Sequence, residues 1–148
     1  MAQLIAVAEA AEDIGSGLSR FLDPVADHSA DVSALIGQCF YTSSALRTLV
    51  KTIGEPRLPP RYPFIDEDLI TVQSSLHYTF KDVQRIIGGL GRDAISGAAY
   101  RRVWRELDDY FFNESGNTLE RRLIIYRQFV DELTDTLIKG YIILVLVP

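Results

Sequence analysis

The chain has 148 residues, 47% of them hydrophobic and 10% aromatic, which is enough for one domain with a core of its own and excludes intrinsic disorder. The net charge of −5 comes entirely from residues 1–34, whose single base is Arg20. Six acids lie in that segment: Glu9, Glu12, Asp13, Asp23, Asp27 and Asp31. The remaining residues hold fourteen acids and fourteen bases, so no basic surplus exists for a phosphate backbone and we expect no nucleic-acid partner.

Cysteine usage and the N-terminus indicate the compartment. Cys39 is the single cysteine, so no intrachain disulfide forms and a reducing environment fits. The first residues lack a basic region, and acids interrupt the apolar run that a signal peptide needs. We therefore expect residues 1–22 to belong to the fold and the protein to be cytoplasmic.

Residues 2–22 carry apolar side chains at alternating spacings of three and four, which places them on one helix stripe. This seam consists of Leu4, Val7, Ala11, Ile14, Leu18 and Phe21. Asp23–Pro24 then predicts the start of a second helix, because Asp is a good N-cap and Pro suits the first helical position. The apolar stripe of that helix continues to about Ile53.

A proline-rich segment separates the second helix from the third. Residues 54–65 hold four prolines in twelve positions, which excludes a helix and predicts an extended segment that crosses the bundle. Asp66, Glu67 and Asp68 follow, and their negative charge suits a helix N-terminus. This third helix is expected to end at the glycines of residues 88–91.

Two further helices complete the pattern. Ser96 is the expected N-cap of the fourth helix, and residues 113–116 read as the turn that follows it. Asn117 with Glu120 resembles a capping box for a fifth helix whose apolar stripe runs from Leu119 to Leu137. Five helices with seams near period 3.5 predict an all-α antiparallel bundle over residues 1–140.

Residues 141–148, YIILVLVP, form a separate apolar C-terminal tail. The run is too short to span a bilayer by itself. Three roles stay open: it completes the core, it extends like a strand, or it marks a point where a longer protein was shortened. An exposed run of this kind would aggregate, so we expect it to be buried in the bundle or in a second copy.

No motif predicts catalysis, a metal or a cofactor. His28 and His77 each lack a second His or Cys at ligand spacing. The acids of residues 66–68 are typical of dipole complementarity at a helix start. Cys39 lies on the apolar stripe of its helix with no basic neighbour, as a structural thiol does. We therefore expect a protein that is not an enzyme.

Arginines and aromatics gather on the fourth and fifth helices, which a short turn joins. The candidate interaction patch consists of Tyr100, Arg101, Arg102, Trp104, Arg105, Arg121, Arg122 and Arg127. Such a surface can dock a protein or an anionic head group. The alternative is a solvated face with inward aromatics, neutralised by Glu106, Asp108, Asp109 and Glu120.

Residues 99–104 (AYRRVW), 110–115 (YFFNES) and 119–129 (LERRLIIYRQF), with 38–46 and 76–85 upstream, resemble the HeLo-like N-terminal domain. That domain stands at the front of fungal NTPase-type receptors and of ankyrin-repeat proteins. The resemblance extends to about residue 138 and implies a helical bundle that acts as a signalling or adaptor module.

In related HeLo domains the N-terminal apolar helix is released to attack membranes. The resemblance assigns this role to residues 1–22. The acids of this segment depart from the pattern, since anionic lipid repels negative side chains. The tail after Gly140 also departs from it, which fits a stand-alone or shortened form.

Three functions follow from the sequence. The first is a protein-interaction module, expected to be a homo-oligomer, that binds itself or another helical domain. The second is a membrane-active effector that uses the seam helix of residues 2–22. The third is a small-ligand carrier or enzyme with a pocket between helices, whose polar groups would come from Tyr41, Tyr62, His77 and Tyr78.

Overall fold

The computed structural model describes residues 2–55, 63–91 and 96–146, and describes side chains for residues 2–55, 65–91 and 96–140. The described part holds five α-helices and no strand, so the predicted all-α class is confirmed. The helices are α1 (Ala2–Leu18), α2 (Ser29–Ile53), α3 (Pro63–Ile87), α4 (Gly97–Ser115) and α5 (Leu119–Leu146). Short 3₁₀ turns occupy Ser19–Phe21, Ala26–His28 and Gly88–Leu90.

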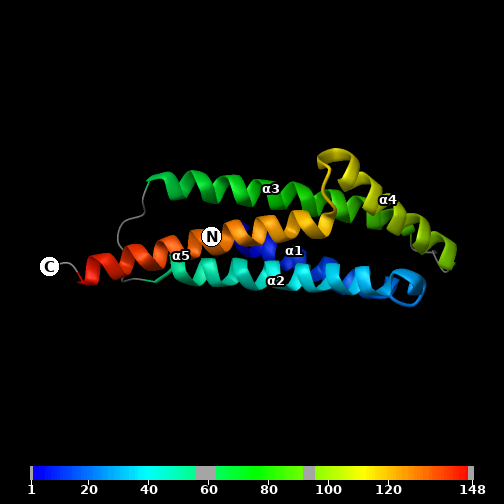
Figure 1. Ribbon diagram of the computed structural model, residues 1–148, viewed down its shortest axis with the longest axis horizontal. Helices are drawn as coiled ribbons and strands as arrows, with labels where there is room; N and C mark the ends of the chain where they lie inside the picture. The colour runs from blue at the N-terminus through cyan, green and yellow to red at the C-terminus, as the bar shows by residue number, and fades with distance from the viewer. Residues whose placement is uncertain (1, 56–62, 92–95, 147–148) are drawn as a thin grey trace.

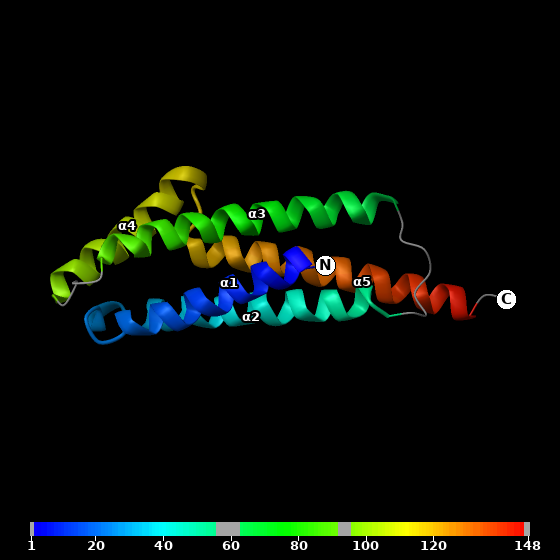
Figure 2. The same ribbon diagram turned by 180° about the vertical axis from the view of Figure 1, so that it is seen from behind.

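The helices form an elongated bundle (Figure 1). α1 and α3 run in one direction along its long axis, and α2 and α5 run in the other. The chain reverses direction after α3, α4 lies beside the end of α3, and α5 continues along the bundle in the same general direction as α4 (Figure 2). The N-terminus lies near the middle of the long axis, and α1 runs beside α2 from the end nearer α4 but stops short of the C-terminal end of α2.

One apolar core runs through the bundle. All six residues of the seam predicted for residues 2–22 lie in it, each less than 5% exposed. α2 contributes Val32, Leu35, Cys39, Leu46 and Leu49 from the facing side. Burying a Leu or Val side chain stabilises the fold by roughly 1.5–3 kcal/mol. Burial of its apolar face is therefore the main interaction that holds α1 in place.

The connection between α1 and α2 differs from the prediction. Asp23 does not cap a helix, because α2 begins only at Ser29. Val25 explains the difference: it is 1% exposed, and its N–H donates to the Phe21 carbonyl at 2.9 Å. The side chain of Val25 thus keeps this stretch packed on the core as the chain reverses direction, and burial overrides the local capping preference.

The proline-rich segment is only partly described. α3 begins at Pro63, earlier than predicted, as the tolerance of Pro for the first helical turn allows. Residues 56–62, Tyr62 among them, lie outside the described residues, so the extended crossing stays a prediction. The predicted stop of α3 is confirmed by the 3₁₀ turn Gly88–Leu90, followed by Gly91 with a φ of 66°.

The ends of α4 and α5 confirm one predicted cap and correct another. The Ser96 hydroxyl accepts from the Ala99 N–H at 3.3 Å, and α4 continues to Ser115 before Gly116 ends it with a φ of 73°. The predicted Asn117–Glu120 capping box is wrong, because Thr118 accepts from the Arg121 N–H at 3.1 Å instead. α5 then runs unbroken through Gly140 to Leu146, which makes residues 141–146 helical and not strand-like.

Candidate interaction surface

The structure divides the predicted arginine–aromatic patch into separate environments. Tyr100 and Trp104 turn inward against the Phe21 ring, with centroid distances of 5.0 and 6.4 Å. Arg101 lies at the end of the bundle, where its guanidinium pairs with Asp27 at 3.4 Å and donates to the Pro24 carbonyl at 3.3 Å. These three residues therefore fasten the α1–α2 connection to α4.

Of the other arginines, Arg105 lines one cleft together with Arg101 and Trp104, and the rest lie in other surroundings. Arg122, whose side chain is 13% exposed, stacks over the Phe111 ring at 5.0 Å and pairs with Glu114 at 3.5 Å. Arg102 and Arg105 line a shallow hollow together with Glu106, Asp109 and Tyr110. The remaining members, Arg121 and Arg127, lie on α5, the first exposed and the second half-buried.

An uncharged stripe runs along the outward face of α2. It consists of Ala30, Ser33, Gly37, Phe40, Tyr41, Ser44 and Thr48, which helical spacing places on one side. Phe40 is 42% exposed and Tyr41 58% exposed, although both are large aromatic side chains. The stripe is about 27 Å long at 1.5 Å per residue, and exposed helix faces of that length ordinarily carry charges.

Neighbouring helices set the two aromatic side chains of the stripe in place. Gly15 of α1 is buried, and a methyl group added there would lie 2.9 Å from Phe40 Cε2, so the absent side chain leaves room for the ring. On the other side, the Arg127 guanidinium of α5 lies 5.6 Å from the Tyr41 ring centroid. Phe40 and Tyr41 are thus held as a ridge along α2 and do not fold into the core.

The α2 stripe was not predicted, although the sequence contains a signal for it. Residues 32–46 hold no charged residue, a run longer than four helical turns. A core-facing stripe explains only one side of such a run, so the absence of charge from the opposite side indicates an uncharged outer face. On sequence alone, we assign Tyr41 to a small-ligand pocket and not to an exposed surface.

Glu12 anchors α1 to α2 beside this stripe. Its carboxylate accepts from the Ser43 hydroxyl at 2.5 Å and from the Arg47 Nε and Nη2 at 2.8 and 3.1 Å. The hydrogen bonds from Arg47 and Ser43 hold the pKa of Glu12 below its ordinary value of 4.5. Ser43 is 3% exposed, so its place on the apolar stripe of α2 is explained by this polar partner.

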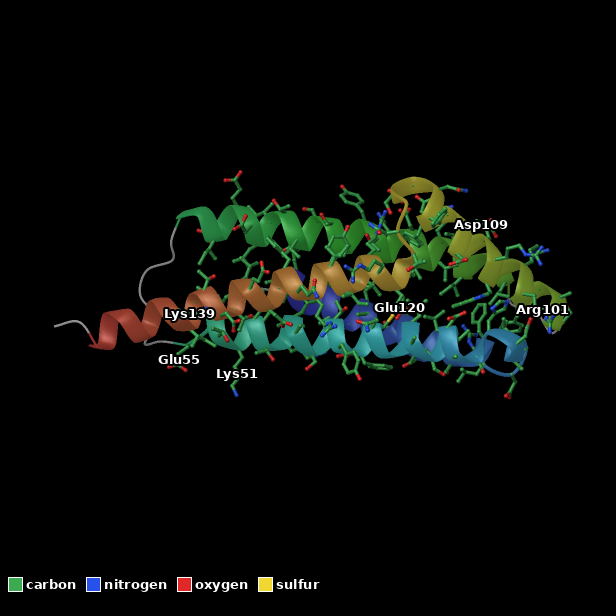
Figure 3. The ribbon with its side chains drawn as sticks, in the orientation of Figure 1. Lys51, Glu55, Arg101, Asp109, Glu120 and Lys139 are labelled. Atoms are coloured by element: carbon green, nitrogen blue, oxygen red, sulfur yellow. The ribbon has the colours of Figure 1, made fainter. Side chains whose placement is uncertain are left out.

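A cleft of about 450 Å³ lies between the start of α2, α4 and the start of α5. Its apolar lining comes from Val25, Leu35, Trp104, Leu107 and Leu119. Charged side chains also line it, Arg101 and Arg105 with four carboxylates. Figure 3 places Arg101 at the outer end of the molecule and Glu120 further in, at the start of α5.

The residues predicted for a small-ligand pocket do not converge. His77 and Tyr78 line a different hollow, of about 480 Å³, between α1 and α3, and their rings contact each other at 5.4 Å. Tyr41 lies on the outward face of α2, away from both. Tyr62 is outside the described residues. The three described side chains, Tyr41, His77 and Tyr78, do not line one shared site.

In the part of the chain that the structure describes, no side chains are arranged for metal binding or for thiol catalysis. No group of three His, Cys, Asp or Glu residues lies there at metal-binding distance. Cys39 is fully buried, and desolvation raises the pKa of its thiol to about 12, so the thiolate nucleophile is suppressed. Over the described ranges, no helix has the length and apolar content to cross a membrane.

Comparisons with known proteins found no match to any family model, curated protein or solved structure. The resemblance to the HeLo-like domain therefore rests on the residues quoted for it above and stays a hypothesis.

Proposed function

We propose that this chain is a non-catalytic interaction module that associates with a second copy of itself through the α2 stripe. The observation that carries the proposal is the exposed aromatic ridge of Phe40 and Tyr41 on a long uncharged helix face. Aromatic side chains that neighbouring helices hold in place are typical anchors of protein interfaces, because little side-chain entropy is lost when a partner covers them.

A second copy fits the stripe because large and small side chains alternate along it. Two α2 helices that pack antiparallel around a two-fold axis would place Phe40 of one copy against Tyr41 of the other. Gly37 of one copy then lies opposite Ser44 of the other, and these small residues let the helices approach closely. A surface on which large and small side chains follow in this order is complementary to a second copy of itself, as a two-fold interface requires.

Charge favours the antiparallel arrangement over the parallel one. The exposed Asp31 lies near the N-terminal end of α2 and the exposed Lys51 near its C-terminal end, whereas Asp27 and Arg47 are already paired with Arg101 and Glu12. Lys51 points away from the bundle, beyond the end of the stripe (Figure 3). Antiparallel packing sets the basic end of each copy near the acidic end of the other, whereas parallel packing opposes like charges.

Sedimentation velocity over a range of concentrations tests the proposal. The wild-type chain is expected to form dimers as concentration rises, and Tyr41→Glu is expected to remain monomeric. The glutamate lies beside Arg127, so the fold tolerates it. Tyr78→Glu is the matched control, because Tyr78 is 65% exposed on α3, away from the stripe.

Two results would overturn self-association through α2. One is a wild-type chain that stays monomeric at the highest concentration the protein tolerates. The other is a dimer that Tyr41→Glu and Tyr78→Glu weaken equally, which would move the interface away from α2.

A cytoplasmic location and a signalling or adaptor role complete the proposal. A buried, unpaired Cys39 supports a reducing compartment. Regulated self-association is a common means by which adaptor domains act, and the resemblance to HeLo-like domains supports the same class of function.

A further inference from the structure

The cleft between α2, α4 and α5 differs from the α2 stripe in both shape and charge. Its volume of about 450 Å³ falls in the range of small-molecule sites, roughly 300–1,000 Å³. No residue of the α2 stripe lines it. The cleft and the α2 stripe are thus lined by different residues, although Asp31, which lines the cleft, also contributes to the charge at the acidic end of α2.

The apolar part of the cleft is aromatic on one side. Trp104 is half-buried: its ring packs at a tilt on Phe21 behind it, and the residue also lines the cleft. Leu35 of α2 and Leu107 of α4 are buried and add aliphatic surface. The body of a ligand that fits these walls is apolar, and a flat aromatic ring can stack on the indole.

The charges that line the cleft favour a cation. The lining acids are Asp27, Asp31, Asp108 and Glu120, and the lining arginines are Arg101 and Arg105. Arg101 is already paired with Asp27 at 3.4 Å. Within the described residues, Asp108, Glu120 and Arg105 form no ion pair, so one excess negative charge lies on the side of α4 and α5. A protonated amine placed there gains two carboxylates and the indole face.

The N-terminus of α5 does not reverse this preference. A helix start attracts anions through its unpaired N–H groups. Here Thr118 accepts from the Arg121 N–H at 3.1 Å, and Glu120 lies in the first turn, where its charge complements the helix dipole. The hydrogen-bonding and electrostatic needs of the N-terminus of α5 are thus largely satisfied by side chains close to it in the sequence.

We propose that this cleft binds a small aromatic amine, with its ring against Trp104 and its ammonium group toward Asp108 and Glu120. Trp104 is the only tryptophan of the chain, so tryptophan fluorescence reports on the surroundings of this one residue of the cleft. Three probes share one phenyl body and differ in charge: phenethylamine, phenethyl alcohol and phenylacetate. Quenching of the indole is expected to saturate with the amine, to be weaker with the alcohol and to be absent with the carboxylate.

Two adjacent acids supply a matched pair of variants. Asp108 lines the cleft and Asp109, also exposed, lines the hollow with Arg102 on another side of α4. Asp108→Asn is expected to weaken amine binding about two- to fivefold, the effect of one partly solvated charge, and Asp109→Asn to leave it unchanged. Unchanged circular dichroism of both variants confirms the fold.

Three outcomes would overturn the proposal: no saturable quenching by the amine, equal binding of amine and carboxylate, or an equal loss in Asp108→Asn and Asp109→Asn. A preference for the carboxylate would identify the cleft as an anion site at the start of α5.

Discussion

Glu12 is an acid on α1 that the fold uses and that helical periodicity alone does not distinguish from its neighbours. Its two partners, Ser43 and Arg47, lie 31 and 35 residues further along the chain, and their three hydrogen bonds favour the ionised carboxylate. A side-chain pair at that separation has no local signature in a sequence. Its place in the fold becomes visible only when α1 is packed antiparallel to α2.

The pH dependence of stability follows from the lowered pKa of Glu12. The unfolded chain binds this proton more readily, so the stabilisation is present above pH 4.5 and is lost as pH falls through the lower folded-state pKa. Glu12→Gln should be less stable than wild type at neutral pH, and the difference should shrink on acidification. Denaturant unfolding measured at several pH values checks this, with Asp13→Asn, exposed on the same helix, as control. A difference that stays constant down to acidic pH would contradict it.

Gly15 and Gly17 respond in opposite ways to the same substitution. A methyl group at residue 15 would lie 2.9 Å from Phe40 Cε2 and 3.3 Å from Cys39 Cβ, whereas at residue 17 the nearest neighbour is the Arg20 side chain at 3.7 Å. Alanine improves helix propensity at both sites by up to about 1 kcal/mol, but overpacking costs roughly 1–3 kcal/mol. Gly17→Ala should raise the melting temperature and Gly15→Ala should lower it. An increase in both variants would show that Phe40 moves aside freely.

At the scale of the elements, α1 decides between an interaction module and a membrane-active effector. Its seam faces the core, and its exposed positions include Ala6, Glu9 and Asp13. The apolar face is therefore committed to α2 and α3 and can reach lipid only if the helix leaves the bundle. Packing of this extent, with the Glu12–Arg47 pair beside it, favours the docked helix.

Flotation with anionic and with neutral liposomes tests this placement of α1. The wild-type chain should remain at the bottom of the gradient, separate from the liposomes, with both kinds of lipid. Ala6→Glu is the control for contact through the exposed side of α1, because Leu4 is 3% exposed and a glutamate there would disrupt the core itself. Flotation of the wild type that Ala6→Glu abolishes would bring the membrane-active alternative back.

At the scale of the whole molecule, the sequence predicts the class of fold well and the surface poorly. Repeated apolar stripes specify which side of each helix is buried, and Ser96 and Gly116 mark the ends of α4 through local geometry. The candidate patch of arginines and aromatics stays a prediction, because its members lie on two helices and spacing along each helix does not reveal how α4 is oriented against α5. The exposure of the α2 stripe could not be predicted for the same reason, because it depends on where α1 and α5 lie.

Self-association through α2 is tested most directly by cysteine pairing across the interface. Gly37→Cys and Ser44→Cys are prepared separately, mixed and oxidised. Cys39 stays silent, because it is fully buried and the pKa of its thiol is raised to about 12. Antiparallel α2 helices predict a disulfide-linked dimer in the mixture, with little cross-linking of either variant alone. Cross-linking of each variant with itself, or none in the mixture, would contradict the proposed interface.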